Sequence, residues 1–180
     1  MQSAPKAGTS TLSACAFFQL RYALSRQQQL SADVSLYVAL SGQWAGKNLD
    51  SSEKFYLGGS SGVRAYPSSE GGGSTGQMLN VELRWQLPQG MNLVGFYDHG
   101  RVTQNADNDF TGAPLVNRFA LKGAGLAMGW RHGSGVSLQA TYARRIGRNP
   151  NAITTEVNRG ADQDGTLHRD RFWLTASVAF

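Results

Sequence analysis

Apolar and polar residues alternate over unusually long stretches of this chain. Between residues 78 and 87 every second position is apolar: Leu79, Val81, Leu83, Trp85 and Leu87. The positions between them are polar: Asn80, Glu82, Arg84 and Gln86. A period of two is typical of β-strands with two different faces. The same pattern predicts seven strands, at residues 12–24, 30–40, 78–87, 91–101, 119–131, 134–146 and 169–180.

The predicted strands are long, and the connections between them alternate in length. Most of them match or exceed the roughly 9 to 11 residues with which a tilted strand crosses a bilayer. Short connections are expected near Gln27–Gln29, at Pro88–Gly90 and at His132–Ser134. Long connections are expected at 45–75, 102–118 and 147–168. Short turns at one end and long loops at the other predict an all-β fold, an antiparallel transmembrane β-barrel of the outer-membrane type.

Composition agrees with strands rather than membrane-spanning helices. Charged residues make up 16%, glycines number 22 and mean hydropathy is -0.33. The chain has no apolar run of about 18 residues, the length that would indicate a membrane-spanning helix. In a barrel the apolar faces meet lipid, and a mixed face meets a wet interior: Arg21, Asp33, Glu82, Arg84 and Asp98. Four aromatic residues fit either interfacial girdles or ordinary strand packing: Trp44, Tyr97, Trp130 and Tyr142.

Charge and cysteine content exclude several classes of function. The formal net charge is +5, but the basic residues are scattered, which argues against a nucleic-acid partner. One basic cluster stands out, formed by Arg144, Arg145 and Arg148, and it fits either lipopolysaccharide phosphates or a solvated loop edge. Cys15 is the single cysteine, so the chain has no internal disulfide.

No motif indicates an enzyme, a metal site or a cofactor. His99, His132 and His168 lack the spacing of metal ligands. The glycine clusters miss both the phosphate-loop and the dinucleotide patterns. The segment 162–165 resembles a fragment of a calcium loop, but the remainder of that motif is missing and a solvated turn is expected.

The segment GGSSGVRAYPSSEGGGSTG, residues 58–76, would read as a flexible linker if it did not contain Val63, Arg64 and Tyr66. A loop folded back into the barrel explains them, because Val63 and Tyr66 would then pack on the inner wall. A buried arginine requires a carboxylate. Asp98 is the first candidate and Glu82 the second. The alternative is a surface loop with an incidental arginine.

Three segments resemble the C-terminal barrel of the haemolysin and haemagglutinin secretion/activation proteins, the TpsB transporters of two-partner secretion. They are Asp50–Gly59, Gly62–Pro67 and the Phe96-x-Asp98-x-Gly100 strand. The resemblance implies a sixteen-stranded barrel preceded by two periplasmic POTRA domains. It implies a pore-loop motif, Val63, Arg64, Ala65 and Tyr66. It also implies that Arg64 pairs with Asp98 of the loop-anchoring strand motif, Phe96, Asp98 and Gly100.

The resemblance also covers the end of the chain. Phe180, with Phe172 and Leu174, is similar to the C-terminal signal by which the barrel-assembly machinery recognises such barrels for insertion. Ala65 stands where the family usually has glycine and would be strained if that position needs a positive φ.

The number of strands also bears on domain organisation. Seven strands is an odd number, and single-chain bacterial barrels have an even one. Residues 1–180 are therefore expected to be the C-terminal part of a larger barrel, or to come from a truncated gene model. The resemblance implies that they form about the last seven of sixteen strands, as a fragment without the POTRA domains and the N-terminal strands.

The function that the resemblance implies is export of a haemolysin- or adhesin-like polypeptide across the outer membrane of a Gram-negative cell. Outer-membrane lipid and lipopolysaccharide are the other expected partners. A BamA- or TamA-type insertase barrel, a passive porin-like barrel and a soluble β-sandwich binding module are the alternatives.

Overall fold

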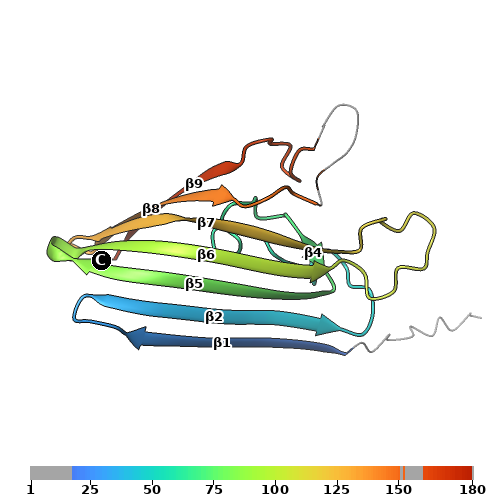
Figure 1. Cartoon of the computed structure of the whole chain (residues 1–180), viewed down its shortest axis with the longest axis horizontal. Helices are drawn as coiled ribbons and strands as arrows, with labels where there is room; N and C mark the ends of the chain where they lie inside the picture. Colours follow the sequence, from blue (N-terminus) through green and yellow to red (C-terminus); the bar gives the residue numbers. More distant parts are fainter. Residues whose placement is uncertain (1–17, 151, 153–159, 180) are drawn as a thin grey trace, which may run out of the picture.

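Seven long strands form one antiparallel sheet in the computed structural model, which describes residues 18–150, 152 and 160–179. They are β1 (Gln19–Gln29), β2 (Val34–Ala45), β5 (Thr75–Leu87), β6 (Met91–Thr103), β7 (Arg118–Arg131), β8 (Val136–Arg145) and β9 (Asp170–Val178). Their order in the sheet, β1-β2-β5-β6-β7-β8-β9, follows the chain (Figure 1). Two short strands, β3 (Phe55–Tyr56) and β4 (Gly72–Gly73), pair within the loop between β2 and β5. The all-β antiparallel prediction is confirmed.

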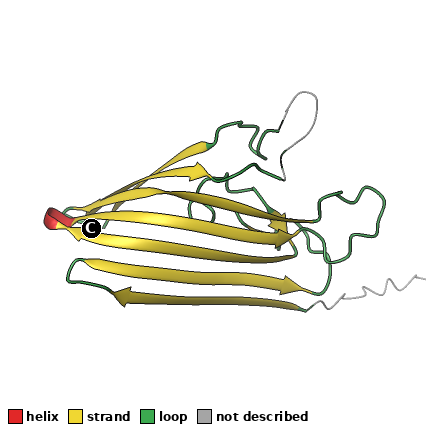
Figure 2. Cartoon of the chain, in the orientation of Figure 1, coloured by secondary structure: helices red, strands yellow, loops and turns green. Residues whose placement is uncertain are grey.

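Short turns gather at one end of the sheet and long loops at the other (Figure 1). The short connections are residues 30–33, the 3-10 turn η1 (Pro88–Gly90) and residues 132–135. Apart from η1, the regular structure of the described residues is strand (Figure 2). Within this part of the chain no helix is long and apolar enough to span a membrane.

The turn predicted near Gln27–Gln29 is wrong. These glutamines belong to β1, where Gln29 pairs with Ser35 of β2. The chain turns instead at residues 30–33, where the backbone N–H groups of Leu30 and Ser31 donate to the Val34 carbonyl over 2.9 and 3.1 Å. Serine and aspartate favour turns and glutamine does not, so residues 31–33 turn more readily.

This shift changes the bounds of the first two strands. Asp33 lies in the turn rather than on the inner face, and β2 extends to Ala45. Residues 12–17 of the first predicted strand, with Cys15, lie outside the described residues.

The strand register places the large exposed apolar side chains on one face of the sheet. They are Leu20, Leu24, Leu40, Trp44, Leu83, Trp85, Tyr97, Leu126, Met128, Trp130, Leu138, Phe172, Leu174 and Val178. We call this side the outer face. A contiguous exposed apolar surface of this extent marks a membrane or protein contact. The four candidate girdle aromatics share this face.

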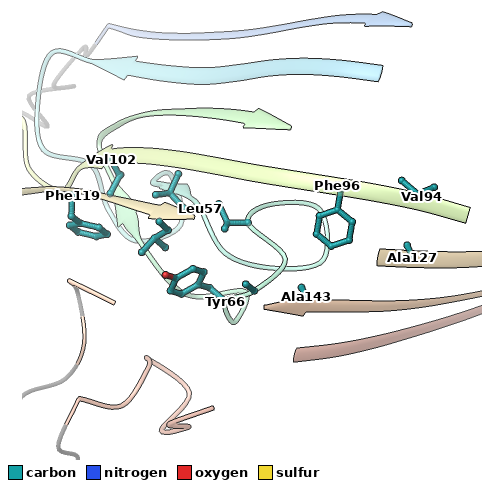
Figure 3. Close-up of a cluster of buried hydrophobic side chains, with 11 residues drawn as sticks. Leu57, Tyr66, Val94, Phe96, Val102, Phe119, Ala127 and Ala143 are labelled. Atoms are coloured by element: carbon teal, nitrogen blue, oxygen red, sulfur yellow. The ribbon is translucent and has the colours of Figure 1, made fainter. Parts of the chain in front are cut away.

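The opposite, inner face carries the loop between β2 and β5, residues 46–74. Buried apolar side chains of this loop pack on strands β6, β7 and β8 (Figure 3). The loop contributes Leu57, Val63, Ala65 and Tyr66. The sheet contributes Val94, Phe96, Val102, Phe119, Leu121, Ala127 and Ala143. The core of the described chain therefore lies between a loop and a sheet.

Two glycines of the sheet make this close packing possible. A Cβ atom at Gly100 would lie 2.7 Å from Leu57 Cδ2, and one at Gly123 would lie 2.6 Å from the Cβ of Ala65. Glycine inside a strand often marks such an approach of another backbone. The inner face is thus shaped to receive the loop.

Gly123→Val is predicted to displace the loop tip, because its side chain would overlap Ala65. Gly95→Val is the matched control, since Gly95 lies on the outer face and a Cβ atom there would lie 3.8 Å from its nearest neighbour, Leu126 Cδ2. We expect trypsin to cleave after Arg64, which is buried in the native fold, at least tenfold faster in Gly123→Val than in the wild type. Equal cleavage rates for the two valine variants would show that the loop does not depend on this contact.

Candidate functional site

Arg64 at the tip of the loop is held by two carboxylates of the inner face. Its Nε and Nη2 donate to Oδ2 and Oδ1 of Asp98 over 2.9 and 2.8 Å, which is a bidentate ion pair. Its backbone N–H donates to the same Oδ2 over 3.0 Å. Its Nη1 lies 2.9 Å from Oε1 of Glu82. The structure thus places both carboxylates that the sequence suggested against this arginine.

Asp98 is fully buried, and its carboxylate receives four hydrogen bonds. Three come from Arg64, and the fourth comes from Asn80 Nδ2 over 2.9 Å. Asn80 was not identified from the sequence. It lies directly opposite Asp98 in the β5–β6 register, so it could have been identified as an inward-facing polar residue from the alternation of the strand.

The remaining surface of the Arg64 side chain is covered by Phe96. The guanidinium carbon lies 3.5 Å from the ring centroid, in the geometry of a cation–π contact. Burial disfavours the charge of Arg64, but the hydrogen bonds and charges of Asp98 and Glu82 outweigh burial and raise the pKa of its guanidinium. The arginine is therefore permanently charged and tightly bound.

A further contact joins the loop tip to the last strand. Trp173 of β9 donates its Nε1 hydrogen to the Arg64 carbonyl oxygen over 2.8 Å. Trp173 was not identified from the sequence, although the alternation of the last predicted strand places it on the inward-facing side. Arg64 therefore connects β5 and β6 to β9 across the inner face.

The backbone of the loop tip is compact and unstrained. Val63 N–H donates to the Leu57 carbonyl over 2.7 Å, and Tyr66 N–H donates to the Val63 carbonyl over 3.0 Å. The strain anticipated at Ala65 does not arise, since among the described non-glycine residues only Gln89 has a positive φ. Its methyl group instead fills the space above Gly123.

A second buried ion cluster lies beside the first. Asp162, in the loop between β8 and β9, pairs with Arg145 of β8 and accepts from Arg171 of β9 over 3.1 Å and from Asn149 over 2.9 Å. Asp162 is fully buried, so the solvated turn expected at residues 162–165 is wrong for this residue. The sequence pattern did not indicate that Arg145 and Arg171 compensate the charge of Asp162.

Arg145 also links this second cluster to the loop tip. Its guanidinium carbon lies 4.3 Å from the centroid of the Tyr66 ring. Burial raises the pKa of Tyr66 to about 12, so its phenol stays neutral. Arg145 thus faces inward and does not share a surface with Arg144, contrary to the basic cluster proposed from the sequence.

The residues of the predicted C-terminal signal lie apart from the loop anchor, whereas Gly100 contacts the loop. Phe172 and Leu174 of β9 point from the outer face, with 78% and 79% of their surfaces exposed, and Phe180 lies outside the described residues. Gly100 lies beneath Leu57. In the described ranges, no three His, Cys, Asp or Glu side chains are placed to hold a metal ion.

Arg64→Ala is predicted to lower the free energy of unfolding by about 3–5 kcal/mol, because it leaves the buried Asp98 carboxylate unpaired. Arg84→Ala is the control. Arg84 pairs with Glu82 over 2.8 Å, but 31% of its side chain is exposed, so its loss is expected to cost about 1 kcal/mol or less. Urea unfolding in lipid vesicles measures both.

The Arg64→Ala/Asp98→Ala double variant should lose clearly less stability than the sum of the two single variants, since both charges are then removed together. Additive losses would mean that the pair is not coupled.

Comparison with known proteins places this chain in a family. A family model described as "Haemolysin secretion/activation protein ShlB/FhaC/HecB" matches residues 2–132. The heme/hemopexin transporter protein HuxB of Haemophilus influenzae (strain ATCC 51907 / DSM 11121 / KW20 / Rd) is 27% identical over 168 residues, which cover 91% of this chain and 27% of that protein. HuxB of strain 86-028NP is 26% identical over 137 residues, 74% of this chain and 24% of that protein.

Two solved structures share the fold. CdiB from Escherichia coli matches with a TM-score of 0.71 and 22% identity, over 91% of this chain and 28% of that one. CdiB from Acinetobacter baumannii matches with a TM-score of 0.54 and 23% identity, over 74% of this chain and 23% of that one. The chain thus spans about a quarter of the length of the relatives it matches. It belongs to the ShlB/FhaC/HecB family of haemolysin secretion/activation proteins, the two-partner secretion transporters that its loop and strand motifs resemble.

Proposed function

We propose that this protein is part of an outer-membrane transporter that exports a haemolysin- or adhesin-like polypeptide. One observation carries the proposal: a loop is anchored by buried Arg64 to the inner face of a sheet whose outer face is apolar and exposed. A passive pore does not require a charged loop tip with a dedicated pair of carboxylates. Membership of the secretion/activation family supports the same reading.

The outer face supports a location in the outer membrane. Its apolar side chains would contact lipid, and aromatic residues stand toward both ends of the strands, with Trp85 and Trp130 near the short turns and Trp44 near the long loops. Such aromatic girdles flank the apolar band of outer-membrane barrels. In this placement the short turns face the periplasm, and Phe172, Leu174 and Phe180 would be read by the barrel-assembly machinery.

The inner face supports a path for an extended polypeptide. Between the loop and the short turns a groove of about 400 Å³ is lined mainly by uncharged polar side chains. These include Gln86, Asn92, Gln139, Thr175 and Ser177. Amide and hydroxyl groups donate and accept hydrogen bonds, so they can replace water along an unfolded backbone without selecting one sequence.

The loop is then a latch across that path. It occupies the inner face beyond the groove, and it is tied by Arg64 to β5 and β6 and by the Arg145–Tyr66 contact to β8. Its release would break both ion pairs of Arg64 and uncover the apolar core beneath the loop, which makes the closed position the stable one in the absence of a partner. Export would require a change that compensates for these losses.

Arg64→Ala is predicted to impair secretion more than membrane insertion, because the outer face and the strand register remain while the latch loses its anchor. We expect at least a tenfold loss of secreted partner with a less than twofold change in the amount of inserted protein. Arg84→Ala serves as the control and should secrete normally. Wild-type secretion by a stably inserted Arg64→Ala protein would refute the latch.

Deletion of the gene in its native bacterium tests the function itself. We expect one large polypeptide to disappear from the culture supernatant and to return on complementation with the wild-type gene. Quantitative proteomics of supernatant and outer membrane measures both compartments. An unchanged supernatant with depleted outer-membrane barrels would identify an insertase instead, and an unchanged supernatant and membrane would leave the porin-like alternative.

A further inference from the structure

Four basic side chains gather on the outer face near the long-loop end of the sheet. Arg101 lies on β6, Arg118 and Lys122 lie on β7, and Arg144 lies on β8, and all four are exposed. In the β6–β7 pairing Arg101 is opposite Ala120, so Arg118 and Lys122 are both its diagonal neighbours. In the β7–β8 pairing Arg144 is opposite Ala124, so Lys122 is its diagonal neighbour. Such diagonal neighbours on paired strands lie about 7–8 Å apart. We call these four residues the basic strip.

The charge of the basic strip is largely uncompensated. Arg144 approaches Asp170 at 3.8 Å, whereas Arg101, Arg118 and Lys122 make no ion pair with any residue of the ranges 18–150, 152 and 160–179. The buried and half-buried arginines of the inner face differ, because Arg64, Arg145 and Arg171 are each paired with a carboxylate. The strip is therefore available to an external anion.

The position of the basic strip relative to the apolar surface indicates which anion. Along β6 the outward residues are Met91, Leu93, Gly95 and Tyr97, followed by His99 and Arg101. Along β8 they are Leu138, Ala140 and Tyr142, followed by Arg144. The cations thus begin where the apolar band ends, on the long-loop side, at the level that lipid headgroups occupy if the band lies in the membrane.

We propose that the basic strip binds the phosphate groups of lipopolysaccharide in the outer leaflet. Arginine offers a planar fork of donors that matches phosphate, and lysine adds a point charge. Cations on neighbouring strands can engage more than one phosphate of the same glycolipid. This inference rests on the outer-membrane placement proposed above, with the long loops outside. It involves Arg144 but not Arg145, which faces inward.

The test compares two double variants of the purified, full-length protein in detergent at about 150 mM salt. Arg101→Gln/Lys122→Gln removes two charges from the basic strip. Arg26→Gln/Arg131→Gln removes two exposed charges elsewhere, since Arg26 lies toward the short-turn end of β1 and Arg131 lines the inner groove. Native mass spectrometry measures the binding of lipid A with both phosphates, of dephosphorylated lipid A and of phosphatidylglycerol.

We expect Arg101→Gln/Lys122→Gln to bind diphosphorylated lipid A at least tenfold more weakly than the wild type, and the control variant to change less than twofold. Arg101→Lys/Lys122→Arg should retain affinity, which separates loss of charge from misfolding. Equal affinities of the two glutamine variants, or equal binding of dephosphorylated lipid A or phosphatidylglycerol by the wild type, would overturn the proposal. No secreted partner is present, so the outcome is independent of whether the protein exports one.

Discussion

The buried ion pair between Arg64 and Asp98 constrains both the loop and the sheet. A guanidinium removed from water must meet carboxylates in good geometry, because an unpaired buried charge costs several kcal/mol. Glu82 and Asp98 can both reach Arg64 only if they lie on the same face of neighbouring strands. A one-residue slip between β5 and β6 would turn one of them to the outer face. The pair therefore helps to fix the strand register while it positions the loop.

The rest of the inner face depends on that placement. Leu57, Val63 and Tyr66 are fully buried by loop and sheet together, so the apolar core exists only while the loop is docked. The second cluster, in which Asp162 meets Arg145 and Arg171, adds the β8–β9 side and brings a further loop against the first. The loop tip is thus held from both sides of the curved sheet, by polar contacts that surround a small apolar centre.

Strand alternation and charge compensation made most of this predictable. The period of two assigned faces to the long strands, and the need of Arg64 for a carboxylate then selected Asp98 and Glu82 from the inward positions. Other features had no local signal. Asp162 is compensated by arginines on two different strands, and Trp173 meets the Arg64 carbonyl from 109 residues away, so both contacts depend on how the sheet curves. The first turn was predicted too early, at Gln27–Gln29, because polar side chains occupy both the end of β1 and the turn that follows it.

Buried arginines of the inner face are paired with carboxylates, whereas most of the basic strip on the outer face is unpaired, and this difference bears on how a latch could open. On the inner face each buried arginine of the described chain is paired with a carboxylate, so displacing Arg64 requires replacement of two carboxylate contacts at once. A passing polypeptide cannot achieve that by collision alone. Under the proposed function, an extended chain in the polar groove would contact Gln139 of β8 and Thr175 of β9. Thr175 is the inward-facing neighbour of Trp173, which binds the Arg64 carbonyl. A shift of β9 would remove the Trp173 bond and the Arg171–Asp162 pair together, which would loosen the loop on the β9 side before the Arg64–Asp98 pair breaks.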